Sequence, residues 1–267
     1  MELYRVAWSC ISLLLFVTFE GSSGEVHGAQ QAAAATRLKP SRRTSKNTKF
    51  VSCFGKGQPT GSYIVQSPIL TSPDGLHRVY VEVEAMAFRP KDEPSDSEPS
   101  CENTSRLFLA GPGDSEFKVL YSQSPPEISD GNSLKLVDWS ADGTNLLIER
   151  TTWNYESEGD FTDLVLFAVS SGTITAPDLL KILEARFGKD CSSENSVIGF
   201  TLGGNVVILV APVKDTYYNE GATSCVKKKT PVALDAKRAL QAVAQVLPAN
   251  FQIRHYGQFP ERQASRK

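Results

Sequence analysis

Short apolar runs separated by tight, glycine-containing turns recur along the middle of the chain. Each of three stretches places an apolar run on either side of such a turn: residues 63–88, 134–152 and 196–211. The turns contain the residue pairs Asp74-Gly75, Asp142-Gly143 and Gly203-Gly204. Aspartate and glycine supply the positive φ angles that hairpin turns need. The pattern therefore predicts three β-hairpins, each with one face turned towards a core.

Further strand-like segments follow each hairpin, so that every repeat contains about four strands. These segments are residues 106–110, 117–121, 164–169, 173–175 and 231–234. Four antiparallel strands per repeat are the plan of a propeller blade. We therefore expect a mainly β fold with propeller-like antiparallel blades in about three repeats.

Two amphipathic segments predict one or two short helices in addition to the strands. In residues 178–187 the apolar side chains return at helical spacing, Thr175 and Asp178 form a capping-box pattern, and Gly188 favours an end of the helix. Residues 236–246 have a similar apolar face and predict a second helix.

Two of the turns resemble a known repeat signature. Ser72-Pro73-Asp74-Gly75 and Trp139-Ser140-Ala141-Asp142-Gly143 are similar to the W-S-P-D-G motif of TolB-like and WD40-like β-propeller repeats, including exported bacterial members of that superfamily. The third turn, Leu202-Gly203-Gly204, lacks the proline and the aspartate. The resemblance covers residues 63–234. It implies propeller-like blades and a role in protein recognition, but it carries no active site onto this chain.

Three repeats are fewer than the roughly four to eight blades of closed propellers. Three explanations stay open: further blades are hidden in the sequence, the sheets form an incomplete or open propeller, or chains associate as a homo-oligomer to close a ring.

The N-terminus predicts export. Residues 6–19 are almost wholly apolar, which is too short for a comfortable bilayer span and typical of a secretory signal. We expect a signal peptide at residues 1–28, cleaved near Gly28 or Ala29, with an uncleaved anchor as the alternative. Residues 29–52 are predicted to be a disordered basic linker in weak contact with a membrane surface at most. The propeller-like domain then spans residues 53–247, and residues 248–267 form a C-terminal tail.

Cysteine usage agrees with a periplasmic or extracellular location. The chain has five cysteines, and cleavage of the signal removes Cys10 and leaves four. We favour the disulfides Cys53–Cys101 and Cys191–Cys225 among three connectivities, because each pair brackets one contiguous segment. The 267 residues carry a net charge of −2 and are 40% hydrophobic, which is ordinary for a globular protein and excludes the basic excess typical of nucleic-acid binding.

Catalytic signatures are absent from the sequence. It contains no G-x-S-x-G, H-E-x-x-H, phosphate-binding loop or dinucleotide-binding motif. Of its three histidines, His77 and His255 have no obvious partner and are interpreted as surface residues. We predict no catalytic residue, metal ligand or cofactor, and no nucleic-acid partner.

Residues 149–163 are the most distinctive segment, because aromatic residues are mixed with acids there. The predicted binding residues are Trp153, Tyr155, Glu156, Glu158 and Asp160. Aromatic side chains dominate binding hot spots, which favours a site for a protein or peptide partner. Two alternatives stay open: a hairpin loop whose aromatics cover the core edge, and a hydrolase-like site that uses a pair of the acids. We therefore predict an exported, non-enzymatic binding or scaffold module, and expect Trp153→Ala to weaken partner capture without changing the unfolding midpoint.

Overall fold

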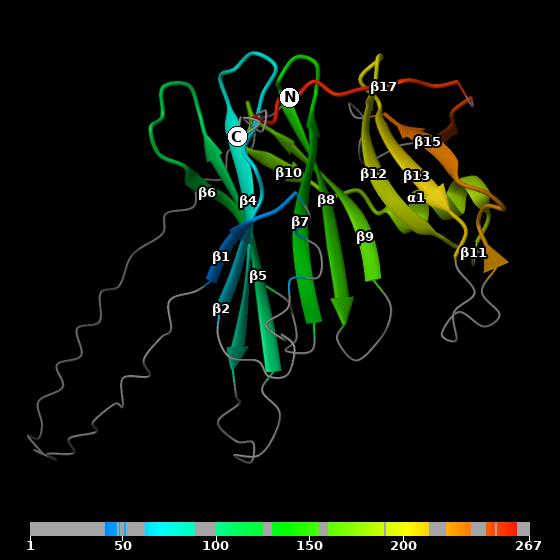
Figure 1. The fold of residues 1–267 in the computed structure, drawn as a ribbon. Helices are drawn as coiled ribbons and strands as arrows, with labels where there is room; N and C mark the ends of the chain where they lie inside the picture. The colour runs from blue at the N-terminus through cyan, green and yellow to red at the C-terminus, as the bar shows by residue number, and fades with distance from the viewer. Residues whose placement is uncertain are drawn as a thin grey trace, which may run out of the picture. The chain divides into compact units, whose positions relative to one another are not determined.

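The structure of the protein is a computed structural model, which describes residues 41–46, 48, 51, 62–88, 100–124, 130–154, 160–189, 191–213, 223–235, 244–248 and 250–260. All of these belong to one compact unit, residues 37–267. This unit is mainly β, with three larger sheets and, in the described ranges, one helix (Figure 1).

Neighbouring strands of the larger sheets are mostly close in the chain, except that the last strand of the chain lies beside an earlier strand in the third sheet. The first sheet has the order β1 (Ser41–Thr44), β2 (Ser62–Gln66), β4 (Arg78–Phe88), β5 (Ser100–Ala110) and β6 (Lys118–Gln123), and β3 (Leu70–Thr71) also pairs with β4. The second has the order β7 (Asp130–Trp139), β8 (Asn145–Asn154), β9 (Asp160–Ala168) and β10 (Thr173–Thr175). The third has the order β17 (Ile253–Arg254), β12 (Glu194–Thr201), β13 (Val206–Ala211), β15 (Thr230–Leu234) and β16 (Gln245–Val246). A separate parallel pair joins β11 (Cys191–Ser192) to β14 (Thr223–Ser224).

The prediction of a mainly β fold with antiparallel sheets is confirmed. Each larger sheet contains four antiparallel strands that are neighbours in the sheet, namely β2-β4-β5-β6, β7-β8-β9-β10 and β12-β13-β15-β16. Three such sheets do not by themselves establish a propeller, so that assignment stays a prediction. The first strand of the first predicted hairpin is divided at Ser67 into β2 and β3. The hydroxyl of Ser67 accepts a hydrogen bond from the N–H of Val81 at 3.0 Å.

The hairpin turns form as the sequence predicts. Gly75, Gly143 and Gly204 have φ angles of 74°, 69° and 82°. In the first turn the Ser72 hydroxyl donates a hydrogen bond to Asp74 and accepts one from the N–H of His77. Ser140 does the same with Asp142 and the N–H of Asn145. The serine before each Asp-Gly pair is therefore part of the turn.

The third turn uses a threonine in the same role. The Thr201 hydroxyl accepts a hydrogen bond from the N–H of Asn205 at 3.1 Å, and the carbonyl of Thr201 accepts the N–H of Gly204 at 2.9 Å. The residue whose N–H donates to the hydroxyl follows the threonine by four positions here, and it follows the serine by five positions in the other two turns. This shorter turn explains why the repeat signature is lost in the third copy although the hairpin remains.

Two turn carboxylates are expected to make the free energy of unfolding depend on pH in the acidic range. The hydroxyl of Ser72 and the N–H of Leu76 lower the pKa of Asp74, and hydrogen bonds from Ser140 and Thr144 lower the pKa of Asp142. Because these pKa values lie below that of an unfolded aspartate, about 3.9, the stabilisation is present above about pH 4 and is lost as the pH falls through the folded values. We expect the free energy of unfolding to fall more steeply below about pH 4 in the wild type than in an Asp74→Asn/Asp142→Asn double variant. Urea unfolding at a series of pH values tests this, and parallel curves would contradict it.

The helix α1 (Leu179–Phe187) confirms one of the two predicted helices and corrects its first residue. Asp178 is the N-cap, because its carboxylate accepts the N–H of Lys181 at 3.1 Å. Thr175 instead ends β10, so the predicted capping box does not form. Gly188 ends the helix as predicted, with its N–H donating to the carbonyl of Glu184.

The second predicted helix, residues 236–246, differs at its described end. Gln245 and Val246 are extended and pair with β15 in the third sheet. The helix prediction is therefore wrong for these residues, and residues 236–243 lie outside the described part of the chain.

Two hydrophobic clusters join the three sheets into one body. Successive residues of a strand point to opposite faces, so β8 contributes to both clusters. Leu146 and Ile148 pack with residues of β4, β5 and β7 between the first and second sheets. Leu147 packs with Leu183 of α1 and Phe200 of β12 between the second and third sheets. Every sheet is therefore held by packing against its neighbour in the chain.

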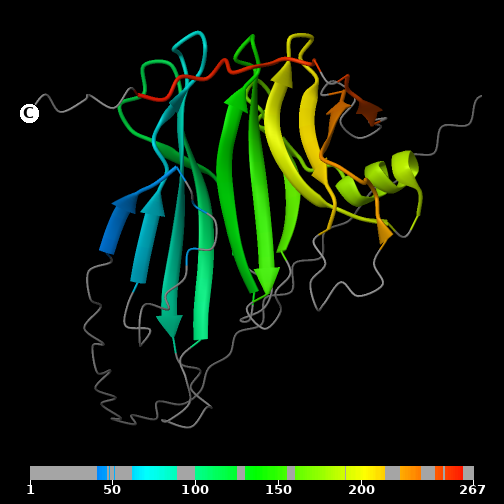
Figure 2. The ribbon, with the colours of Figure 1, turned by 45° about the vertical axis from the view of Figure 1, so that its right-hand side comes forward.

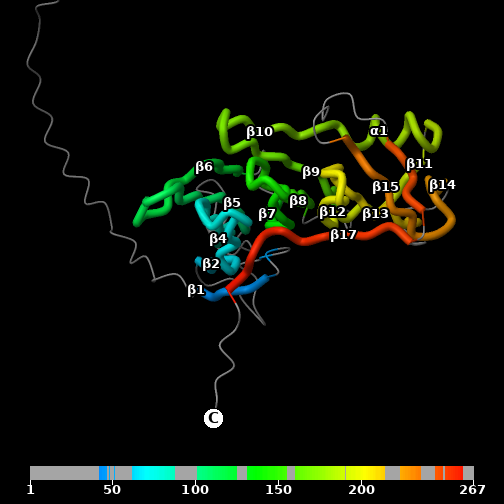
Figure 3. The backbone as a smooth tube through the Cα atoms, turned by 90° about the horizontal axis from the view of Figure 1, so that it is seen from above, coloured from blue at the N-terminus to red at the C-terminus, as the bar shows by residue number. Residues whose placement is uncertain are grey.

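Residues 250–260, predicted as part of a tail, form a strap that crosses all three sheets (Figures 2 and 3). In the third sheet Ile253 pairs with Thr201 of β12. At the second sheet the backbone of Gly257 donates to Asp138, and at the first the backbone of Gln258 exchanges two hydrogen bonds with Thr71 at 2.8 and 2.9 Å. We call residues 250–260 the C-terminal strap; it joins elements that are far apart in the sequence.

The described part of the predicted linker, residues 29–52, is also ordered. β1 pairs in parallel with β2. Thr48 is buried and donates a hydrogen bond to the carbonyl of Leu134, while Val51 is buried and accepts one from Asn103. These residues are held by the first and second sheets and do not form a free tether.

Candidate binding site

The predicted binding segment, residues 149–163, is the end of β8, the beginning of β9 and the connection between them. The two strands are antiparallel neighbours, and their last pair is Trp153 with Asp160. Tyr155, Glu156 and Glu158 belong to the connection and lie outside the described residues. The two strand ends fix where this connection leaves the second sheet.

Trp153 is a core residue of the second sheet. Its side chain is only 6% exposed and lies directly against Gly131, its partner on β7. A Cβ atom added to Gly131 would lie 2.1 Å from the indole ring, so only glycine leaves room for the tryptophan. Trp153 therefore supports the base of the connection from within and does not present its ring to a partner.

Phe161 is the aromatic side chain that the base of the connection does expose. It is 74% exposed, the highest value among the large apolar side chains that the structure describes as exposed. Asp160, the preceding residue of β9, is exposed as well. Phe161 is not among the binding residues predicted from the sequence. The sequence feature that indicates its exposure is its position outside the continuous apolar run 164–167, from which Thr162 and Asp163 separate it.

A strong ion pair holds the strand that carries Phe161. Two residues further along β9, Asp163 lies 2.7 Å from the guanidinium group of Arg150 on β8. Although burial opposes it, the hydrogen bond and the charge of Asp163 raise the pKa of Arg150 above its ordinary value, so the guanidinium stays charged. The backbone pairing and this ion pair together fix the position of Phe161.

The described carboxylates of the segment do not converge as an acid–base pair. Glu149 is 1% exposed, lies 3.4 Å from the ammonium group of Lys135 and accepts the N–H of Val197 at 2.9 Å. It thus connects the second and third sheets. Asp163 lies on the opposite face of the second sheet, where it pairs with Arg150. The hydrolase-like alternative gains no support from these two groups.

One carboxylate–histidine pair occurs elsewhere, between Asp138 and His255. The Asp138 carboxylate is 1% exposed and lies 3.2 Å from Nδ1 of His255, whose side chain is 65% exposed. The same carboxylate accepts the N–H groups of Trp139, Tyr256 and Gly257 at 2.8, 3.1 and 2.7 Å. Four contacts converge on it, three of them from the C-terminal strap. The pair therefore anchors the strap, and the interpretation of His255 as a residue without a partner is wrong.

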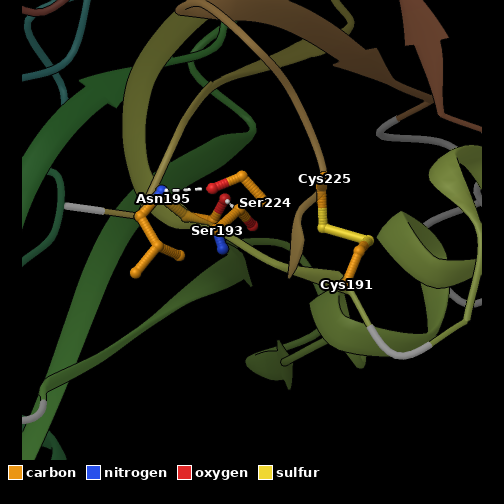
Figure 4. The surroundings of a disulfide bond; sticks show 6 residues. Cys191, Ser193, Asn195, Ser224 and Cys225 are labelled. Carbon is orange, nitrogen blue, oxygen red and sulfur yellow. Dashed lines mark hydrogen bonds between the residues drawn. A yellow bond between two sulfur atoms is a disulfide. The ribbon is translucent and has the colours of Figure 1, made fainter. Parts of the chain in front are cut away.

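The disulfide Cys191–Cys225 is confirmed (Figure 4). It joins Cys191, the first residue of β11, to Cys225, which directly follows β14, and the N–H of Cys225 also donates to the carbonyl of Ser192 at 2.9 Å. Cys101 is disulfide-bonded as well, and its predicted partner Cys53 lies outside the described residues. Disulfides indicate an oxidising environment such as that of exported proteins.

Neither a metal site nor a membrane span is found in the described ranges. No group of three or more His, Cys, Asp or Glu side chains there has the arrangement of a metal site. The helix that the structure describes lacks the length and hydropathy of a membrane-spanning segment.

Comparison with known proteins does not assign the chain to a family. No family model matches it, and no curated protein is significantly similar to it. The base of the β8–β9 connection combines buried Trp153 with exposed Asp160 and Phe161.

Proposed function

We propose that the protein is an exported, non-enzymatic binding module of TolB-like or WD40-like propeller-like blades, which recognises a protein partner through the β8–β9 connection. The export part rests on the predicted signal peptide and on the disulfide between Cys191 and Cys225. The recognition part rests on the exposed aromatic residue at the base of the connection.

The exposure of Phe161 is the observation that carries this proposal. Phe161 is 74% exposed, so most of its apolar surface is in contact with water. Burying that surface at an interface would be favourable. Because β9 is paired with β8 and Asp163 is held by Arg150, the backbone beneath Phe161 loses little freedom on binding. A fixed aromatic anchor of this kind is typical of a binding hot spot.

The charge around Phe161 indicates the chemistry of the partner. Asp160, the residue before Phe161 in β9, is exposed, and the sequence adds Glu156 and Glu158 nearby in the chain. Acidic residues close to an apolar anchor in the chain favour a partner with an apolar pocket edged by lysine or arginine. Binding is therefore expected to weaken as the salt concentration rises.

A pair of surface variants tests the proposal. We expect Phe161→Ser to weaken capture of the partner from an extracytoplasmic extract by about 30-fold or more, since hot-spot residues contribute about 2 kcal/mol or more. Val119→Ser is the matched control, because Val119 is also an exposed apolar strand residue, 54% exposed on β6 in the first sheet. The measurement is the affinity of each immobilised variant for the captured protein after its purification.

Both variants are expected to keep the unfolding midpoint of the wild type, because neither side chain belongs to a core cluster. Equal affinity of the Phe161→Ser variant and the wild type would contradict the proposal. Loss of a turnover activity on replacing Glu156 or Asp160 by its amide would instead support the hydrolase-like alternative.

A further inference from the structure

A second surface of the protein concentrates positive charge in one turn. Lys227, Lys228 and Lys229 follow one another between β14 and β15, and all three are exposed. None of the three forms an ion pair with a carboxylate in the part of the chain that the structure describes. We call residues 227–229 the lysine turn. Its three ammonium groups are available to a ligand of opposite charge.

The N-terminal side of the lysine turn is anchored to the body. Cys225 is bonded to Cys191 (Figure 4), and its N–H donates to the carbonyl of Ser192. Val226 is only 7% exposed and packs into the cluster between the second and third sheets. The chain therefore enters the lysine turn from a fixed point.

The C-terminal side of the lysine turn is fixed as well. Thr230 begins β15 and pairs with Val210 of β13. The hydroxyl of Thr230 also donates to the carbonyl of Lys228 at 2.8 Å, which holds the turn to the strand. With both ends held, binding orders the lysine side chains but little of the backbone, so the entropy cost is small.

We propose that the lysine turn binds a membrane surface that carries anionic lipid headgroups. Lysine ammonium groups are compact point charges without the planar fork of arginine, which suits a diffuse layer of charge better than one bidentate ligand. Val226 points into the core, so the contact is electrostatic and does not insert an apolar side chain. Such binding is reversible and is screened by salt.

A nucleic acid fits the lysine turn less well than a membrane. The turn has no aromatic side chain on which bases stack, and three adjacent charges cover only a short part of a phosphate backbone. The net charge of the whole chain is −2, without the basic excess typical of nucleic-acid binding.

Vesicle sedimentation of the exported full-length protein tests the proposal. We expect binding to vesicles of phosphatidylcholine with phosphatidylglycerol, none to phosphatidylcholine alone, and loss of binding at high salt. Replacing Lys227, Lys228 and Lys229 by glutamine is expected to lower the partition coefficient on the order of 100-fold, since each lysine near an anionic surface contributes about fivefold. A matched variant replaces Arg43, Lys118 and Lys181, which are exposed elsewhere, by glutamine and removes the same charge. It is expected to keep binding within about threefold of the wild type.

Four results would overturn the proposal. Equal losses in the two triple variants would show that net charge acts without the lysine turn. Unchanged binding of the lysine-turn variant, or equal binding to neutral vesicles, would place the contact elsewhere in the protein. Binding of inorganic polyphosphate without binding of the anionic vesicles would show that the turn takes a soluble polyanion.

Discussion

Replacing Asp138 by alanine is expected to detach the C-terminal strap and to lower the free energy of unfolding by about 3–5 kcal/mol. The buried carboxylate accepts the N–H groups of Tyr256 and Gly257 from the strap and that of Trp139 from its own strand. Alanine accepts none of these hydrogen bonds, so the strap N–H groups stay buried without partners unless the strap moves into water. Detachment exposes these N–H groups to water and so limits the loss of free energy of unfolding. It also removes the backbone pairing of the strap with the first and third sheets.

Trypsin sensitivity measures this detachment directly. Arg254 lies in β17, where backbone pairing with Phe200 keeps the following peptide bond in an extended ladder. We expect trypsin to cut after Arg254 much faster in Asp138→Ala than in the wild type. Asp163→Ala is the matched control, because it removes a partly exposed carboxylate that does not contact the strap. Equal cleavage rates at Arg254 in the wild type and Asp138→Ala would contradict the role of Asp138 as the anchor.

The second large effect is expected at Trp153. Burying all but 6% of this side chain makes Trp153→Ala a cavity-forming change, with an expected loss of about 3–5 kcal/mol. Gly131→Ala is also expected to destabilise, because the new methyl group meets the indole ring at 2.1 Å. Since Trp153→Ala removes that ring, the double variant should lose less stability than the sum of the two single changes.

Urea unfolding of the wild type, both single variants and the double variant gives the coupling between the two sites. Phe161→Ala serves as the control on the same pair of strands, and its exposed ring predicts a change below about 0.5 kcal/mol. An unfolding midpoint that Trp153→Ala leaves unchanged would contradict the core role of Trp153 and restore the expectation drawn from the sequence.

The hairpins and α1 were predictable because their causes are local. The Asp-Gly pairs at Asp74 and Asp142 fix the turns within a few residues, and the alternating apolar residues define the strands on each side. The disulfide Cys191–Cys225 was predictable because it closes one contiguous segment. None of these features needs information from a distant part of the sequence.

The C-terminal strap was not predictable, because its contacts are made with residues far away in the sequence. Asp138 and Gly257 are separated by 119 positions. The β17 pairing involves only two residue pairs, which leaves no periodic pattern. The order around Thr48 and Val51 has the same origin, since both are buried by strands that come later in the chain.

The candidate site was only partly predictable for a similar reason. Composition located the segment 149–163, but it did not separate the buried aromatic from the exposed one. That distinction depends on Gly131, which leaves space for Trp153 on one face of the second sheet. Phe161 has no such partner and remains exposed on β9.

Site-specific photo-crosslinking tests the proposed recognition site most directly. A photoreactive phenylalanine analogue replaces Phe161 in the full-length protein in its native host, and the same analogue replaces Val119 in a control. The proposed function predicts one discrete protein adduct from position 161 and none from position 119. Absence of an adduct at position 161, or the same adducts from both positions, would contradict recognition of a partner at the base of the β8–β9 connection.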